Sequence, residues 1–178
     1  MNWKIISVAP DYMVSDHGDI KSLPRTAPVK NGFYRIVRER ILKQHMDSLK
    51  KYMTVVLRID NKPKTFFVHR LVAEAFVPNP TKENTVNHKN RNGLDNRVQN
   101  IEWCSIRENA SHGQLGRKKS SKYIGVTKAY KGQWRSSIRI NGRRIVLGQR
   151  FKTEKEAHQA YQKALVEYGI ENKYAKVV

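Results

Sequence analysis

The middle of the chain constrains the fold more than any other part of the sequence. Two short apolar runs, Val86–His88 and Ile101–Cys104, flank a loop rich in Asn and Gly, Lys89–Gln99. A helix is predicted to follow from about Ser105 to Leu115. This order predicts a small unit of two short strands and a helix, with a long polar loop between the strands.

The flanking segments predict further small units. His17–Gly18 lies between two short apolar runs and predicts a turn joining two strands. The β-rich runs Tyr52–Leu57 and Phe66–Val68 are separated by Asp60–Pro63, which predicts a hairpin loop. His69–Phe76 has the apolar spacing of a helix.

Three strands and one helix are predicted in the C-terminal third. Tyr123–Lys128, Gln133–Ile140 and Arg143–Arg150 have strand patterns, and Asn141–Gly142 is a strong two-residue hairpin signal. Thr153, with Glu156 three residues later, predicts a capped helix that ends near Gly169. We therefore expect an α+β protein. Its predicted segments are a small β-rich module at 1–60, a central domain at 61–116, a linker at 117–121, and a three-stranded antiparallel sheet packed on one helix at 122–178.

The charge predicts a polyanionic partner. The net charge is +20, from 35 Lys and Arg against 15 Asp and Glu. Arg117–Val178 alone carries 16 Lys and Arg against 4 Asp and Glu. No apolar run is long enough to span a membrane. The single cysteine, Cys104, and the lack of an export signal favour a cytoplasmic protein that is not secreted.

Residues 65–112 resemble the HNH family of nucleases, which is built on a ββα-metal finger. The matching residues are Val68–Ala73, Val86–His88, Asn92, Asn96, Asn100–Trp103 and Glu108–Asn109. A lone histidine in a polar loop is more often structural than catalytic, but this set of residues at the family's spacing reverses that preference. The resemblance implies a DNA endonuclease.

Four residues take catalytic roles by this resemblance. His88 would be the general base, and Asn100 would brace the loop that orients it. Asn87 and Asn109 would present side-chain oxygens to one Mg²⁺ or Mn²⁺ ion per active centre. Many family members carry Asp immediately before the catalytic histidine, and Asn87 is a weaker, uncharged ligand.

The C-terminal segment resembles the plant ethylene-response-factor (APETALA-type) DNA-binding domain. The resemblance covers residues 121–170 and rests on Tyr123, Gly125–Val126, Gly132–Trp134, Ile138–Arg139, Arg144–Ile145, Leu147–Gly148, Phe151, Ala157 and Ala160–Tyr161. It implies a sheet in the major groove with the helix behind. Alternation independently places Arg135, Ser137 and Arg139 on one strand face.

The N-terminal segment carries Trp3, Tyr12, Val14–Ser15, Gly18 and Ile20–Leu23. With these residues it resembles, more weakly, a small module that precedes HNH domains in homing nucleases and contacts DNA. The predicted DNA-binding residues come from all three segments. They are Arg135, Ser137, Arg139, Arg144, Thr127, Lys128, Arg150, Lys21 and Arg70.

The sequence therefore predicts a phage-type homing or free-standing HNH endonuclease that nicks double-stranded DNA in the cytoplasm, in the host cytoplasm if phage-encoded. Neither a membrane nor an obligatory protein partner is expected. A DNA-binding regulator with a decayed nuclease centre is the alternative, and Asn87 supports it. An RNA-binding protein would explain the charge but none of the motifs.

Overall fold

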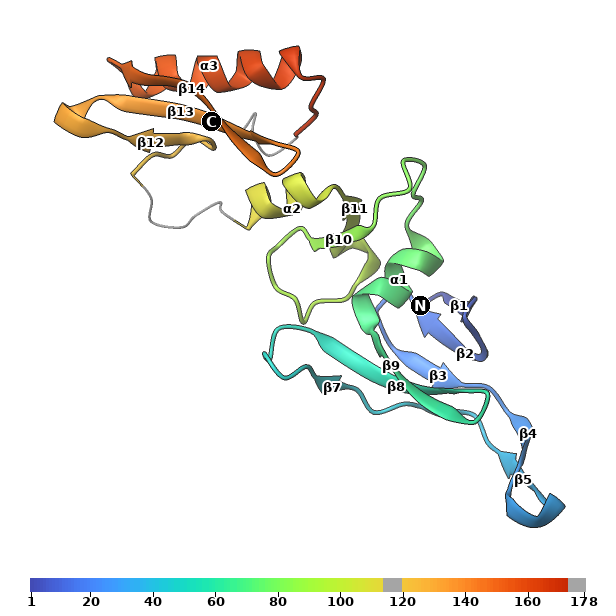
Figure 1. Cartoon of the computed structure of the whole chain (residues 1–178). Helices are drawn as coiled ribbons and strands as arrows, with labels where there is room; N and C mark the ends of the chain where they lie inside the picture. Colours follow the sequence, from blue (N-terminus) through green and yellow to red (C-terminus); the bar gives the residue numbers. More distant parts are fainter. Residues whose placement is uncertain (114–119, 173–178) are drawn as a thin grey trace. The chain divides into compact units, whose positions relative to one another are not determined.

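The computed structural model describes residues 1–113 and 120–172. The chain folds into two compact units, Met1–Ser105 and Ile106–Val178 (Figure 1). The predicted linker 117–121 and the end of the helix predicted to reach Leu115 lie partly outside the described residues. Within those residues, no helix is long and apolar enough to cross a membrane.

The first unit contains four antiparallel sheets and one α-helix, α1. The sheet orders are β1-β2-β3-β6, β4-β5, β7-β8-β9 and β10-β11. The strands are β1 Trp3–Ile6, β2 Ala9–Ser15, β3 Ile20–Ser22, β4 Arg25–Pro28, β5 Tyr34–Val37, β6 Arg40–Ile41, β7 His45–Met46, β8 Met53–Ile59, β9 Lys62–Phe67, β10 Thr85–His88 and β11 Ile101–Cys104. Short 3-10 turns occur at Lys30–Gly32 and Val98–Asn100.

Helix α1, Val68–Phe76, is the centre of this unit and confirms the helix predicted over His69–Phe76. Its apolar face is buried because Val68, Leu71 and Val72 recur at helical spacing. It contacts strands from both ends of the unit, β1 and β2 as well as β8, β9, β10 and β11.

A single hydrophobic core contains residues from both sides of residue 60, where we expected a boundary between two domains. Strands β2, β3 and β8 contribute buried side chains that join those of α1 and β11. The core comprises Ile6, Ala9, Tyr12, Val14, Ile20, Val55, Leu57, Val68, Leu71, Val72, Ala73 and Ile101. The N-terminal strands and the central segment therefore form one packed body.

The β8–β9 hairpin was expected with a loop over Asp60–Pro63, but its turn is shorter. Asp60 and Asn61 both have positive φ, 50° and 59°, and together make the two-residue turn. A two-residue turn of this hand matches the twist of paired strands. Lys62 and Pro63 therefore belong to β9, an edge strand, where a proline is tolerated.

The second unit contains helix α2, Ile106–His112, a three-stranded antiparallel sheet and helix α3, Glu154–Glu167. Its strands are β12 Val126–Lys128, β13 Trp134–Ile140 and β14 Arg143–Phe151, with a 3-10 turn at Tyr130–Gly132. β12 begins three residues later than the strand predicted from Tyr123. Helix α3 packs on the sheet through Tyr161, Ala164 and Leu165.

Local signals set the ends of these elements. Asn141 and Gly142 have φ of 46° and 78° and form the predicted two-residue turn between β13 and β14. Thr153 Oγ1 accepts a hydrogen bond from the Glu156 amide, and the Glu156 carboxylate accepts from the Thr153 amide, which confirms the capping box. The α+β prediction is confirmed as a mixture of helices and antiparallel sheets.

Candidate active site

The candidate centre lies on the β10–β11 hairpin. The antiparallel register places Asn87 opposite Glu102 and His88 opposite Ile101. His88 is the last residue of β10, as the sequence predicts, and is 5% exposed. A strand end fixes the backbone of His88 while leaving the following loop free to wrap over its side chain.

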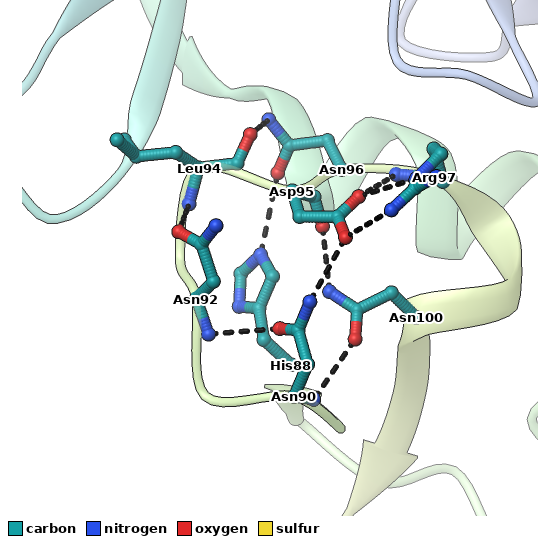
Figure 2. Close-up of polar contacts among 8 residues, drawn as sticks. All are labelled: His88, Asn90, Asn92, Leu94, Asp95, Asn96, Arg97 and Asn100. Carbon is teal, nitrogen blue, oxygen red and sulfur yellow. Dashed lines mark hydrogen bonds and ion pairs between the residues drawn. The ribbon is translucent and has the colours of Figure 1, made fainter.

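Asn100 holds both ends of that loop. Its Oδ1 accepts from the Asn90 amide at 2.9 Å, and its Nδ2 donates to the Asp95 carbonyl at 2.8 Å (Figure 2). The Asn100 carbonyl also accepts from the Lys89 amide at 2.9 Å. These contacts join the backbone on both sides of the loop that follows His88.

Other polar side chains complete the loop. Asn90 Oδ1 accepts from the Asn92 amide, and Asn92 Oδ1 accepts from the Leu94 amide, at 2.8 and 3.1 Å. Asp95 receives two hydrogen bonds from the Arg97 guanidinium, which together with the Arg97 charge lower the pKa of Asp95 to about 2. The richness of this loop in Asn and Asp is thus explained by side chains that satisfy its backbone.

Three side chains surround the His88 imidazole. Its ring centroid lies 5.8 Å from that of Tyr52 and 5.1 Å from that of His69. Its Nε2 lies 3.3 Å from Asn96 Oδ1. Burial lowers the pKa of His88, while the Asn96 hydrogen bond and the Asp95 charge raise it in part.

His69 is a second buried imidazole. It is 7% exposed, and its Nδ1 has no hydrogen-bond partner among the described residues. Burial, with smaller effects from the charges of His88 and Arg70, lowers the pKa of His69 to about 4. Both rings are therefore neutral near neutral pH, the form in which a histidine can accept a proton.

Asn87, one predicted metal ligand, has a carboxylate beside it. Its Nδ2 donates to Glu102 Oε1 at 2.8 Å, so its amide nitrogen faces Glu102. The described residues contain no group of three or more His, Cys, Asp or Glu side chains that could hold a metal. Amide and carboxylate oxygens still suit Mg²⁺, which keeps several waters and needs few protein ligands. Asn109 belongs to α2 in the second unit, and its pairing with Asn87 stays a prediction.

Two predicted DNA-binding residues of the first unit make contacts within it. Lys21 Nζ lies 3.4 Å from Glu39 Oε1 and 4.8 Å from the centroid of the Trp3 ring. Arg70 stacks over Trp103 and donates to the Asn84 carbonyl at 3.1 Å. These contacts hold the two cationic side chains in fixed positions. Binding DNA would therefore cost less conformational entropy than it would with freely moving side chains.

The remaining DNA-binding candidates gather on the sheet of the second unit. Arg139 pairs with Arg144 across β13 and β14, and Ser137 pairs with Val146, which is 45% exposed. Arg144 Nε donates to Ser137 Oγ at 3.1 Å. Ile138 and Ile145, paired with each other, face the helix instead. The predicted separation into an apolar and a cationic face therefore holds along this stretch of the hairpin.

The cationic face continues past two irregularities of register in β13. Thr127 on β12 pairs with Arg135, and Lys128 follows it at an exposed position. Arg135 and Arg150 line one surface hollow with Tyr130, Lys131 and Gln133. The Nε of Arg135 is buried there without a hydrogen-bond partner among the described residues.

Sequence reasoning gave no role to several residues that lie around His88. Asn96 and Glu102 were part of the family pattern, but the pattern did not indicate their contacts. Tyr52 is distant in sequence, and only the packing of β8 against α1 brings it to the site. The family pattern and the density of polar residues after His88 both pointed to Asn96, but neither indicated that it contacts the His88 ring.

Two family models match separate parts of the chain. Residues 1–58 match the family model described as the NUMOD4 motif, and residues 66–111 match the model described as HNH endonuclease. Two uncharacterized HNH endonucleases of Acanthamoeba polyphaga mimivirus are 39% and 37% identical over 110 and 117 residues, each covering 62% of this chain. The matches span only 29% and 25% of those relatives' lengths.

A solved structure of DNA binding and cleavage by the HNH homing endonuclease I-HmuI is 30% identical, with a TM-score of 0.49. That match covers 66% of this chain and 62% of the other. The HNH endonuclease model covers α1, the β10–β11 hairpin and most of α2, so it includes His88, Asn100 and Asn109. Residues 66–111 therefore match the HNH endonuclease family.

Proposed function

We propose that this protein is a metal-dependent endonuclease that hydrolyses phosphodiester bonds in double-stranded DNA. The observation that carries the proposal is His88, a buried imidazole at the end of β10 within the segment that matches the HNH endonuclease model. The net charge of +20 supports a nucleic acid as the substrate.

His88 is the general base in this proposal. Its lowered pKa keeps the ring unprotonated near neutral pH, so it can take a proton from the attacking water. Asn100 fixes the loop that follows His88 through its hydrogen bonds to the Asn90 amide and the Asp95 carbonyl. The ring neighbours Tyr52 and His69 limit the ring's movement.

Asn87 and Asn109 would hold one Mg²⁺ or Mn²⁺ ion through their side-chain oxygens. When bound, the ion stabilises the charge on the departing oxygen of the phosphodiester. The hydrogen bond from Asn87 Nδ2 to Glu102 supports this assignment, because it turns the amide nitrogen towards the carboxylate and leaves Oδ1 on the opposite side.

The C-terminal sheet would hold the DNA, in the manner of an ethylene-response-factor domain. Guanidinium groups can contact phosphates or read guanine in the major groove. The proposed contacts of this sheet are Thr127, Lys128, Arg135, Ser137, Arg139, Arg144 and Arg150, and Lys21 and Arg70 would add contacts from the first unit.

One HNH centre cuts one strand at a time, so we expect nicking by a phage-type homing or free-standing enzyme that acts in the cytoplasm. Wild-type protein and His88→Ala are incubated with supercoiled plasmid and Mg²⁺, and His45→Ala, at an exposed position of β7, serves as the matched control. We expect wild type and His45→Ala to produce open-circular DNA, and His88→Ala and EDTA-treated wild type to produce none.

Equal nicking by wild type and His88→Ala would disprove the assignment of the base. Retarded migration of DNA in a gel by a wild-type protein that never nicks it would instead favour the regulator with a decayed centre. Asn87, in place of the Asp found in many relatives, is the residue that makes this second outcome worth testing.

A further inference from the structure

We propose that Asn96 is a positioning residue that holds His88 in a single neutral tautomer, and that the Ser15–Asp19 turn of the N-terminal segment holds Asn96 in place. This inference rests on the proposed function, in which His88 is the general base. It gives the N-terminal segment a role in catalysis besides any contact with DNA.

The orientation of the Asn96 amide follows from its two neighbours. Asn96 is 6% exposed, and its Nδ2 donates to the Leu94 carbonyl at 3.5 Å (Figure 2). Since a carbonyl can only accept, the amide nitrogen must face Leu94, and the amide oxygen faces His88.

The tautomer of His88 follows in turn. An amide oxygen can only accept a hydrogen bond, and Asn96 Oδ1 lies 3.3 Å from His88 Nε2. His88 Nε2 must therefore carry the hydrogen in the neutral ring, and the lone pair is on Nδ1. Without Asn96, the hydrogen could move to Nδ1, and the basic nitrogen would then be the wrong one.

The turn between β2 and β3 packs directly on Asn96. Gly18 has φ of +92°, and a Cβ at this position would lie 2.8 Å from Asn96 Cβ and 3.3 Å from the Asn96 carbonyl oxygen. Glycine is required at this position for two reasons. Any other residue would be strained by the positive φ, and its side chain would push Asn96 away.

Hydrogen bonds fix this turn and join it to the loop after His88. The Asp16 carbonyl accepts from the Val98 amide at 2.8 Å, two residues beyond Asn96. Ser15 Oγ accepts from the Asp19 amide at 2.9 Å, and the Gly18 carbonyl accepts from Gln44 Nε2 at 2.7 Å. The turn is thus a rigid support rather than a passing contact.

The first experiment replaces Asn96 by Leu in the full chain and measures nicking of supercoiled plasmid in Mg²⁺. We expect kcat to fall about 10- to 100-fold, no more than the lower limit of the roughly 100- to 10,000-fold that a general base contributes, while KM for the plasmid changes less than about twofold. Asn79→Leu is the control. Asn79 also braces a loop, by accepting from the Glu83 amide and donating to the Glu83 carbonyl, but lies outside the site.

The second measurement is independent of activity. In ¹⁵N-labelled protein at mildly alkaline pH, the ring nitrogens of His88 should show a protonated Nε2 in wild type and a mixture of tautomers in Asn96→Leu. Asn96→Asp, which keeps an acceptor opposite Nε2, should retain the wild-type pattern.

A third variant perturbs Asn96 from a distance. Gly18→Ala should lower kcat and disturb the His88 tautomer, whereas Gly32→Ala should do neither. Gly32 also has a positive φ, +75°, but a Cβ there meets nothing within 4 Å. If Gly18→Ala does not fold, as thermal melting would reveal, Asn96→Leu still decides the question.

The outcomes separate this inference from the proposed function. Full nicking by His88→Ala would overturn the proposed function itself. If His88→Ala is inactive but Asn96→Leu keeps the wild-type kcat, the inference alone is wrong. The same conclusion follows if Asn96→Leu loses activity while Nε2 stays protonated, because Asn96 would then act only on structure.

Discussion

Acidification should destabilise the first unit through His69. The imidazole is buried in the fold, and its pKa falls from 6.5 to about 4. Between these two pKa values the unfolded chain binds more protons than the folded chain, so the free energy of unfolding decreases as the pH falls. The contribution of His69 is fully present above the unfolded pKa and is lost as the pH falls towards 4.

The magnitude follows from the shift. One pKa unit corresponds to about 1.4 kcal/mol, so the full effect is roughly 3 kcal/mol and the part lost between pH 7 and pH 5 is about 2 kcal/mol. This is a large fraction of the stability of an ordinary domain.

Urea unfolding followed by tryptophan fluorescence at the two pH values measures this loss. His69→Phe keeps a ring of similar size and removes the titrating group. Between pH 7 and pH 5 this variant should therefore lose about 2 kcal/mol less of its free energy of unfolding than wild type does. His45→Phe, at an exposed position of β7, should behave as wild type. If His69→Phe lost as much stability on acidification as wild type, the buried neutral imidazole could not be the cause.

Two further predictions concern the second unit. Thr153→Ala removes the oxygen that caps α3 and should reduce the free energy of unfolding by about 1 kcal/mol in urea titrations, whereas a loss below the error of the titration would mean that the cap adds nothing. DNA binding should weaken steeply as the salt concentration rises, and Arg144→Ala should reduce the slope of log K against log salt concentration by about 1. Titrations of a fluorescent duplex would measure both, and an unchanged slope would show that Arg144 contacts no phosphate.

Local signals were sufficient for much of the secondary structure. The spacing of Leu71 and Val72 predicted α1, Asn141–Gly142 predicted the turn of the last hairpin, and Thr153 with Glu156 predicted the start of α3. Each of these signals depends on residues that lie only a few positions apart in the sequence. For the same reason β10 and β11 could be placed around the loop that separates them.

The sequence could not predict contacts that depend on long-range packing. Tyr52 and His69 come to His88 only because β8, α1 and β10 share a core. Gly18 contacts Asn96 across 78 positions of sequence, and nothing near either residue indicates the other. The two-residue turn at Asp60–Asn61 was missed because Pro63 suggested a longer loop.

Helices and antiparallel hairpins could therefore be predicted, while the surroundings of His88 could not. His88 and Asn100 were predicted as site residues because the family pattern includes their positions. The polar and aromatic neighbours that set the pKa and orientation of His88 needed the structure.

The single core of the first unit has a consequence for how such proteins can recombine. Residues matching the NUMOD4 motif supply Val14, Ile20, Val55 and Leu57 to a core completed by α1 and Ile101. If recombination replaced the N-terminal segment, the apolar face of α1 would be exposed to water unless the new segment carried apolar side chains that pack on α1 in the same way. These two segments are therefore expected to be inherited together, whereas the sheet of the second unit has a core of its own and could be exchanged without exposing the core of the first unit.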